Sequence, residues 1–306
     1  MRAAIIITLA LLVTACPSDR TAQKTLYGST VDLPPPLHAP APPAVAIITG
    51  LRAPESALHD PEQDVYFISN INGGMLTVDG NGFLSRVDAK TLEVQLKWVD
   101  SGKNGTRLDA PKGMAILGDL LYVADIDKVR KFDRRTGAPA GEIAIPGTTF
   151  LNDIATDGHS LYVSDTGVRL GPGTTFVATG TDAIWKITGD RAEKIAAGTD
   201  LGRPNGLDYV GGSLHAVTFG SNELYALQNG EKKEIARFPT GQLDGLVHLA
   251  DGTAVVTSWE GDEIYRGRDA ILAGLDAPAD IGYDARRHRL LVPHPPSNQV
   301  TLHLLR

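Results

Sequence analysis

The sequence predicts an all-β fold, a single six-bladed β-propeller closed by an N-terminal strand that pairs with the last blade. Short apolar runs separated by turn residues recur six times at a mean spacing of about 45 residues, which is typical of four-stranded propeller blades. The 33 glycines and 19 prolines indicate many turns. The helical periods that a parallel α/β fold would need are absent, and a β-sandwich would not explain six similar units.

Residues 1–16 are predicted to be a signal peptide outside the fold. Arg2 precedes an apolar run, residues 3–13, that is too short to span a bilayer as an ordinary helix. The run leads to Ala15-Cys16, which resembles the bacterial lipoprotein signal whose cysteine becomes lipidated. Cys16 is the only cysteine, so an intramolecular disulfide is impossible. An ordinary signal peptide with a chance cysteine is the alternative.

Residues 17–43 are rich in proline and poor in large apolar residues, so we expect an extended tether. The tether would hold the propeller, residues 44–306, at the cell envelope, facing the periplasm or the outside of the cell. A closed propeller has no free sheet edge that needs a partner, so we expect a monomer.

Each blade is expected to begin with an inner strand that lines the central channel. The predicted starts lie at residues 54–57, 111–114, 151–154, 204–207, 243–246 and 278–281. The sixth blade has only three strands before the chain ends. The run Ala44–Thr49 otherwise has no partner, and we expect it to supply the missing outer strand and so close the ring.

Two rings of side chains are expected at one mouth of the channel, because the second strand of each blade runs back to the start of the first. The first ring comprises Glu55, Lys112, Asn152, Asn205, Asp244 and Ala279. The second comprises Asn70, Asp125, Asp165, Phe219, Trp259 and His294. The two carboxylates and two carboxamides of the first ring are oxygen donors, which suit a hard divalent cation, above all Ca²⁺.

Four short motifs carry a resemblance to a known family. They are APES around Glu55, FLND around Asn152, PNGL around Asn205 and LDGL around Asp244. The sequence from about residue 45 to the end resembles the SMP-30/gluconolactonase/LRE-like family of six-bladed propellers, with paraoxonases as distant relatives. The resemblance implies that these four residues bind one divalent cation, Ca²⁺ first, with Mg²⁺, Mn²⁺ or Zn²⁺ as alternatives. It also implies that Asp244 acts as general base.

The chemistry that the resemblance implies is metal-assisted hydrolysis of a small-molecule lactone or ester. Asp244 would accept a proton from the attacking water. Because a metal-bound carboxylate is a poor base, the second-ring groups Asp125, Asp165 and His294 remain alternatives. Trp259, together with Phe219, would form an apolar wall for a substrate, or would simply pack between blades.

Lys112 departs from the expected ring of oxygen donors, because an ammonium close to Ca²⁺ is repulsive. It would bind a substrate carboxylate or a developing oxyanion, or else pair with Glu55 and replace the metal. The segment Thr166–Asp182 is rich in glycine and threonine, and we expect it to cover or encircle the mouth.

Several other functions are disfavoured. The formal charge of −7 and the absence of basic runs argue against a nucleic-acid partner. No HxxxH or GxSxG motif occurs, which argues against a zinc hydrolase of that type and a serine esterase. A non-catalytic envelope propeller that binds a protein, peptide or glycan remains the alternative to the hydrolase, as does a metal-bound scaffold without turnover.

The lipid anchor predicts that Cys16→Ser releases the protein into the soluble fraction, because the acyl chains need the thiol. Cell fractionation followed by detection of the protein measures this. Unchanged membrane association of the variant would contradict the anchor.

Overall fold

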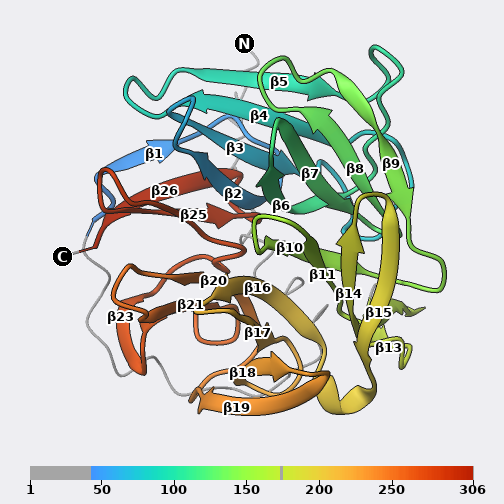
Figure 1. Cartoon of the computed structure of the whole chain (residues 1–306). Helices are drawn as coiled ribbons and strands as arrows, with labels where there is room; N and C mark the ends of the chain where they lie inside the picture. Colours follow the sequence, from blue (N-terminus) through green and yellow to red (C-terminus); the bar gives the residue numbers. More distant parts are fainter. Residues whose placement is uncertain (1–42, 173–174, 306) are drawn as a thin grey trace, which may run out of the picture.

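The chain forms six antiparallel sheets arranged as blades around a central channel (Figure 1). The computed structural model describes residues 43–172 and 175–305, and within them it contains six four-stranded sheets and one two-stranded sheet. The predicted fold class is therefore confirmed. The signal peptide and all of the predicted tether except Pro43 lie outside the described residues.

Blades one to five follow chain order, with the innermost strand first. Blade one consists of β2 (Pro54–Asp60), β3 (Val65–Asn70), β4 (Phe83–Asp88) and β5 (Val94–Asp100). Blade two consists of β6 (Pro111–Leu117), β7 (Leu120–Asp125), β8 (Lys128–Asp133) and β9 (Pro139–Ala144). Blade three consists of β10 (Leu151–Thr156), β11 (Leu161–Asp165), β14 (Ala183–Thr188) and β15 (Arg191–Ala197). Blade four consists of β16 (Pro204–Val210), β17 (Ser213–Thr218), β18 (Glu223–Gln228) and β19 (Glu231–Arg237). Blade five consists of β20 (Leu243–His248), β21 (Ala254–Ser258), β22 (Glu263–Arg266) and β23 (Asp269–Ala273).

The sixth blade joins the two ends of the propeller. It consists of β24 (Gly282–Asp284), β25 (Arg289–His294), β26 (Gln299–Leu304) and the N-terminal strand β1 (Ala46–Ile48). Strand β1 pairs antiparallel with β26, with Ala46 opposite Leu302 and Ile48 opposite Val300. The predicted closure is thus confirmed, and it removes the exposed edge of the last blade.

Ion pairs and an apolar layer join blade six to blade one. The Arg287 guanidinium donates to both carboxylate oxygens of Asp64, at 2.8 and 2.7 Å, and to Asp284 at 2.9 Å. The Tyr66 hydroxyl donates to Asp284 at 2.7 Å. Bidentate guanidinium–carboxylate pairs hold orientation as well as charge, so this contact aligns the two blades that the chain connects last.

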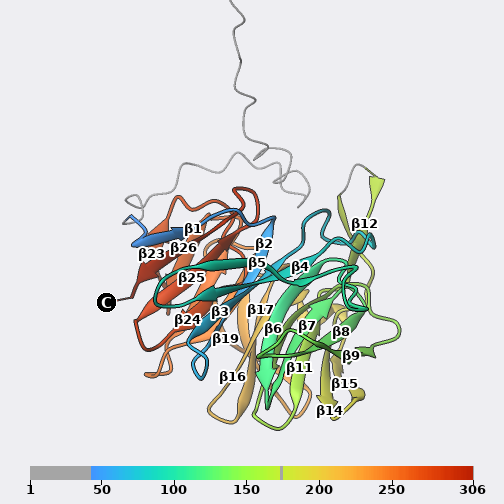
Figure 2. The same cartoon turned by 90° about the horizontal axis from the view of Figure 1, so that it is seen from above.

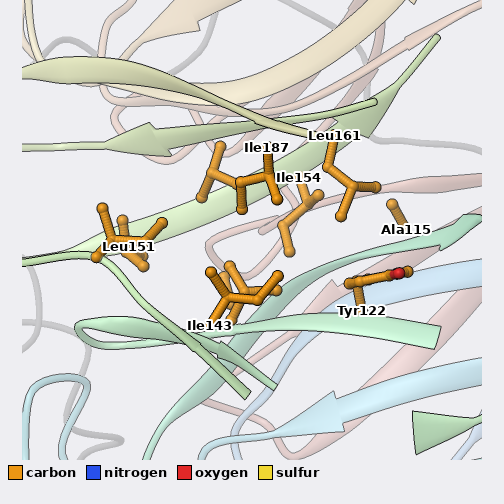
Figure 3. Packing of buried hydrophobic residues seen from close by; sticks show 11 residues of the cluster. Ala115, Tyr122, Ile143, Leu151, Ile154, Leu161 and Ile187 are labelled. Atoms are coloured by element: carbon orange, nitrogen blue, oxygen red, sulfur yellow. The ribbon is translucent and has the colours of Figure 1, made fainter. Parts of the chain in front are cut away.

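The hydrophobic core is divided into layers between neighbouring blades. Figure 3 shows the layer between blades two and three, where Ala115 and Tyr122 lie near Ile154 and Leu161, and Ile143 lies near Leu151. Equivalent clusters separate the other pairs of blades. Because neighbouring blades cover both faces of a blade, second strands such as β3 and β11 are buried on both sides, whereas outer strands such as β9 and β15 remain largely exposed.

Two features depart from the regular pattern. In blade six the inner strand begins at Gly282, because Asp280 forms an isolated parallel bridge with Ser56 of blade one. In blade three a hairpin of β12 (Val168–Leu170) and β13 (Phe176–Ala178) is inserted between β11 and β14 and projects beyond the blades (Figure 2). No helix among the described residues is both long and apolar enough to cross a bilayer.

Candidate active site

Blades one to five carry the same β-bulge at the start of the inner strand. In blade one the pairing shifts between Pro54 and Ala57, so Glu55 and Ser56 together face one residue of β3. The same one-residue shift occurs in β6, β10, β16 and β20. A bulge interrupts the alternation of a strand and re-aims its side chains. The first-ring residues of blades one to five occupy the first bulge position.

Hydroxyl groups on the second strand satisfy the bulged backbone in blades one, three and five. In blade three the Ser164 hydroxyl accepts from the Asp153 N–H at 2.9 Å and donates to the Asn205 carbonyl of the next blade at 2.8 Å. Ser69 and Thr257 accept the equivalent N–H groups in blades one and five. These short side chains thus stabilise each bulge, and in blades three and five they tie it to the neighbouring inner strand.

Four side chains of the first ring line one cavity at the mouth of the channel: Glu55, Asn152, Asn205 and Asp244. Each is at least 96% buried. The cavity has about 20 Å³ of room for the centre of a water-sized sphere, which is enough for a water or a single ion. The structure therefore brings together the four residues that the sequence motifs single out.

Hydrogen bonds orient both amide groups with their oxygen atoms free. Asn205 Nδ2 donates to the Leu243 carbonyl at 3.2 Å, which can only accept. Asn152 Nδ2 lies 3.1 Å from the Thr166 hydroxyl, whose single proton is already donated to the Pro204 carbonyl. Thr166 must therefore accept from Asn152. Both amide oxygens remain available to a ligand.

Three oxygens of the set are buried without a hydrogen-bond donor: Glu55 Oε2, Asn205 Oδ1 and Asp244 Oδ1. A buried polar atom without a partner costs free energy. The atoms that these four side chains can offer to a ligand are all oxygens. These features fit a hard cation such as Ca²⁺. The described residues contain no metal-binding group of three or more His, Cys, Asp or Glu side chains, so a cation here would depend on the two amide oxygens.

Lys112 is fully buried beside this set but does not line the cavity. Its ammonium donates to the Ala110 carbonyl at 2.9 Å and lies 4.5 Å from the centre of the Phe150 ring. Within the described chain it makes no ion pair with a carboxylate closer than 4.0 Å. Burial lowers the pKa of Lys112 to about 8, while the charges of Glu55 and Asp125 oppose that shift.

The two carboxyl groups of the site, Glu55 and Asp244, both have raised pKa values. Burial raises the pKa of Asp244 to about 8, the charge of Asp153 adds to this, and the nearby Trp259 indole opposes it. Burial and the charge of Asp244 raise the pKa of Glu55 well above its ordinary value, although Lys112 opposes the shift. Without a bound cation, the site thus favours protonated carboxyl groups.

The second-ring residues Asn70, Asp125, Asp165 and His294 hold the backbone rather than line the cavity. Asp125 accepts from the Ala110 N–H at 2.8 Å and from Arg130 Nε at 3.0 Å, and Asp165 accepts from the Phe150 N–H at 3.0 Å. Further bonds of this kind join Asn70 to Arg52, and His294 to Asp276 and Thr301. Their hydrogen bonds fix the turns that lead into or out of the blade.

The predicted second ring was misaligned by one residue in blades four and five. Strand β17 ends at Thr218 and β21 ends at Ser258, so Phe219 and Trp259 lie one position beyond the residues equivalent to Asp165. Because neighbouring positions point in different directions, this shift places both aromatic rings on the cavity. Their equivalent in blade three is Thr166, which also lines the cavity.

Four further residues line the cavity, Met75, Phe150, Val168 and Phe176, and the last two lie in the segment that was expected to cover the mouth. Phe176 comes from the inserted hairpin, and its ring centre lies 5.9 Å from that of Phe150 and 6.4 Å from that of Phe219. The segment 166–182 was expected to cover or encircle the mouth, and its hairpin does contribute the aromatic cover. The short apolar run Phe176-Val177-Ala178, inside a segment rich in glycine and threonine, was the available signal.

No protein-family model and no curated protein matches the sequence of this chain. Solved structures do match its fold. A catalytically inactive virginiamycin B lyase from Staphylococcus aureus, crystallised with quinupristin, superposes with a TM-score of 0.55 at 15% identity, over 82% of this chain and 95% of that one. A luciferin-regenerating enzyme gives 0.60 at 10% identity, over 84% and 94%. The nidogen/laminin complex gives 0.54 at 16% identity, over 82% of each chain. At these identities the likeness shows the fold alone.

The raised pKa of Asp244 predicts how its contribution to stability depends on pH. Between its ordinary value of 3.8 and about 8, the folded protein retains a proton that the unfolded chain has released. The contribution of Asp244 therefore falls as pH rises through this window. Asp244→Asn removes that loss, so the variant should gain stability relative to the metal-free wild type as pH increases.

Urea unfolding in a chelator, at about pH 5 and about pH 8, measures the difference. Asp269→Asn, an exposed position on the outer strand β23, removes the same formal charge and should show no such trend. A difference between Asp244→Asn and wild type that stays constant with pH would contradict the prediction.

Proposed function

We propose that this chain is a metal-dependent hydrolase of a lactone or ester, with Ca²⁺ as the first candidate metal. The observation that carries the proposal is the set of three buried oxygens without donors, from Glu55, Asn205 and Asp244, around a cavity of ionic size. Asn152 completes the set. The resemblance of the four surrounding motifs to the SMP-30/gluconolactonase/LRE-like family supports the same conclusion.

Once bound by Glu55, Asn152, Asn205 and Asp244, a divalent cation would polarise the carbonyl of the substrate and acidify a water. The two carboxylates would balance its charge, and the two amide oxygens would add ligands without adding charge. The protein keeps both amides in this orientation through the bonds to Leu243 and Thr166. The two amide oxygens would therefore need no reorientation to bind the cation.

Asp244 is the candidate general base. Its carboxyl group lies in the cavity, and its Oδ1 has no well-formed hydrogen bond, so it can accept a proton from a water placed there. The aromatic side chains of Phe150, Phe219 and Trp259 line the same cavity and would exclude bulk water. Lys112 lies just outside it and would stabilise negative charge that develops beside Phe150.

The structural neighbours include two enzymes, a virginiamycin B lyase and a luciferin-regenerating enzyme. They support an enzyme of the hydrolase or lyase class, by analogy of fold. The place of action that we propose, the bacterial cell envelope with a lipid on Cys16, rests on the sequence motif.

A second candidate function is non-catalytic binding of a protein, peptide or glycan. The small cavity favours it, because about 20 Å³ leaves no space for a lactone ring unless Phe176 shifts. The nidogen/laminin complex is a structural neighbour that is itself a protein assembly. Turnover of a small substrate separates the two candidates.

Metal binding is expected to raise the melting temperature of the protein. A ligand that binds only the folded state adds about 2.7 kcal/mol at a hundredfold excess over its dissociation constant. After chelation, Ca²⁺ should stabilise wild type and Asp269→Asn alike, and should leave Asn205→Ala and Asp244→Asn unshifted. Equal shifts in all four proteins, or no shift with Ca²⁺, Mg²⁺, Mn²⁺ or Zn²⁺, would remove the proposed site.

Hydrolysis is expected to depend on Asp244. With a panel of small lactones and aryl esters, Asp244→Asn should lower kcat/KM by about a hundredfold or more, as removal of a general base does. Chelation should abolish turnover, and the metal should restore it. Asp269→Asn should match wild type. Undiminished turnover by Asp244→Asn, or turnover of no substrate by the metal-loaded wild type, would count against the hydrolase.

A further inference from the structure

A second cavity opens at the opposite end of the channel. It has a volume of about 570 Å³, within the range of small-molecule pockets. All six blades contribute residues to it, and those from the inner strands lie at or after the second bulge position. In the first cavity, the inner-strand residues are those at the first bulge position. The two cavities share no lining residue, so the ring of bulges separates them.

Two carboxyl groups form the base of this second cavity. Asp153 occupies the second bulge position of blade three, Asp280 lies two residues before the inner strand of blade six, and they are 5% and 8% exposed. Asp153 accepts from the Ile154 and Leu207 N–H groups, each at 2.6 Å. Asp280 Oδ2 accepts from the Ser56 hydroxyl. Asp280 Oδ1 has no partner among the described residues and is not enclosed by protein, so it faces the cavity.

No positively charged side chain of the described residues offsets these two groups. Neither makes an ion pair within 4.0 Å. Arg134 lines the cavity, but its guanidinium is bound to Asp60 and Glu62. Lys112 donates to Ala110 and does not line this cavity. Burying a carboxylate without a counter-charge is costly, so the base of the cavity is suited to a cation supplied by a ligand.

The walls of the cavity are largely apolar. They are formed by side chains of five inner strands and the start of blade six, among them Leu58, Met114, Ile154, Leu207, Leu246 and Ile281. An aliphatic or aromatic body would bury its surface against them. A metal ion would find few ligands, because Ca²⁺ takes six to eight oxygens and both oxygens of Asp153 already accept N–H groups.

We propose that this cavity binds a primary ammonium compound with an apolar body, its ammonium group bound to Asp280 and attracted by the nearby negative charge of Asp153. The ammonium donates to Asp280 Oδ1 and provides the missing positive charge. The apolar body lies along the inner strands toward the open end. This site is distinct from the proposed hydrolytic site and does not depend on it.

Calorimetric titration of the Ca²⁺-saturated protein with n-hexylammonium tests the proposal. We expect saturable binding, with n-hexanol at least about tenfold weaker because it lacks the charge. Asp280→Asn retains the shape and the acceptor for Ser56, and should weaken hexylammonium about tenfold or more. Asp269→Asn loses the same charge at an exposed position and should bind like wild type.

The comparison of hexylammonium with hexanol uses wild-type protein, so the test stands even if Asp280→Asn does not fold. Equal binding of the two compounds, no binding of either, or equal affinity in the Asp280→Asn and Asp269→Asn variants would overturn the proposal. Increasing Ca²⁺ could instead compete with hexylammonium, and Asp280→Asn could abolish that competition. This result would assign the second cavity to an inorganic cation and would also overturn the proposal.

Discussion

Close approach of the six inner strands around the axis is the constraint on which the structure depends. A Cβ at Gly206 would lie 2.1 Å from the Asp244 carbonyl oxygen, and one at Gly245 would lie 2.4 Å from the Ile281 nitrogen. At Gly113 it would lie 2.5 Å from the Asp153 Cα. Backbone atoms cannot move as flexible side chains do, so three of the five second bulge positions accept only glycine. This contact closes the waist of the channel and divides it into two cavities.

The same close approach brings together acidic groups from four different blades. Glu55, Asp153, Asp244 and Asp280 are each buried, and each has a pKa raised by burial and by its acidic neighbours. Lys112 is the one buried cation that acts on Glu55. Such a cluster is costly to ionise without external cations. Electrostatics therefore favours cationic ligands at both ends of the channel, a metal at one and an ammonium at the other.

Polar side chains near the mouth divide into two kinds according to their position on the blade. Residues at the ends of the second strands, such as Asp125 and Asp165, use their oxygens on backbone N–H groups of adjacent turns. Residues in the bulges, such as Asn205 and Asp244, keep an oxygen without a donor. Both kinds are buried polar residues in similar sequence contexts. Only the second kind has capacity left for a ligand, which is why the functional proposal rests on it.

The sequence by itself determined the six-bladed fold, the closing strand and the four residues of the candidate metal site. The fold and the closing strand follow from local signals, since apolar runs and turn residues repeat along the chain, whereas the four site residues follow from four different motifs and the family that they resemble. Tertiary structure alone decided the one-residue shift that brings Phe219 and Trp259 onto the cavity, the saturation of Asp125, Asp165 and His294, and the second cavity above Asp153 and Asp280. Bulge register depends on how the first two strands of a blade pair, and the partners of Asp125, Asp165 and His294 lie 5 to 18 residues away across turns whose geometry no local pattern encodes. The second cavity needs residues from all six blades.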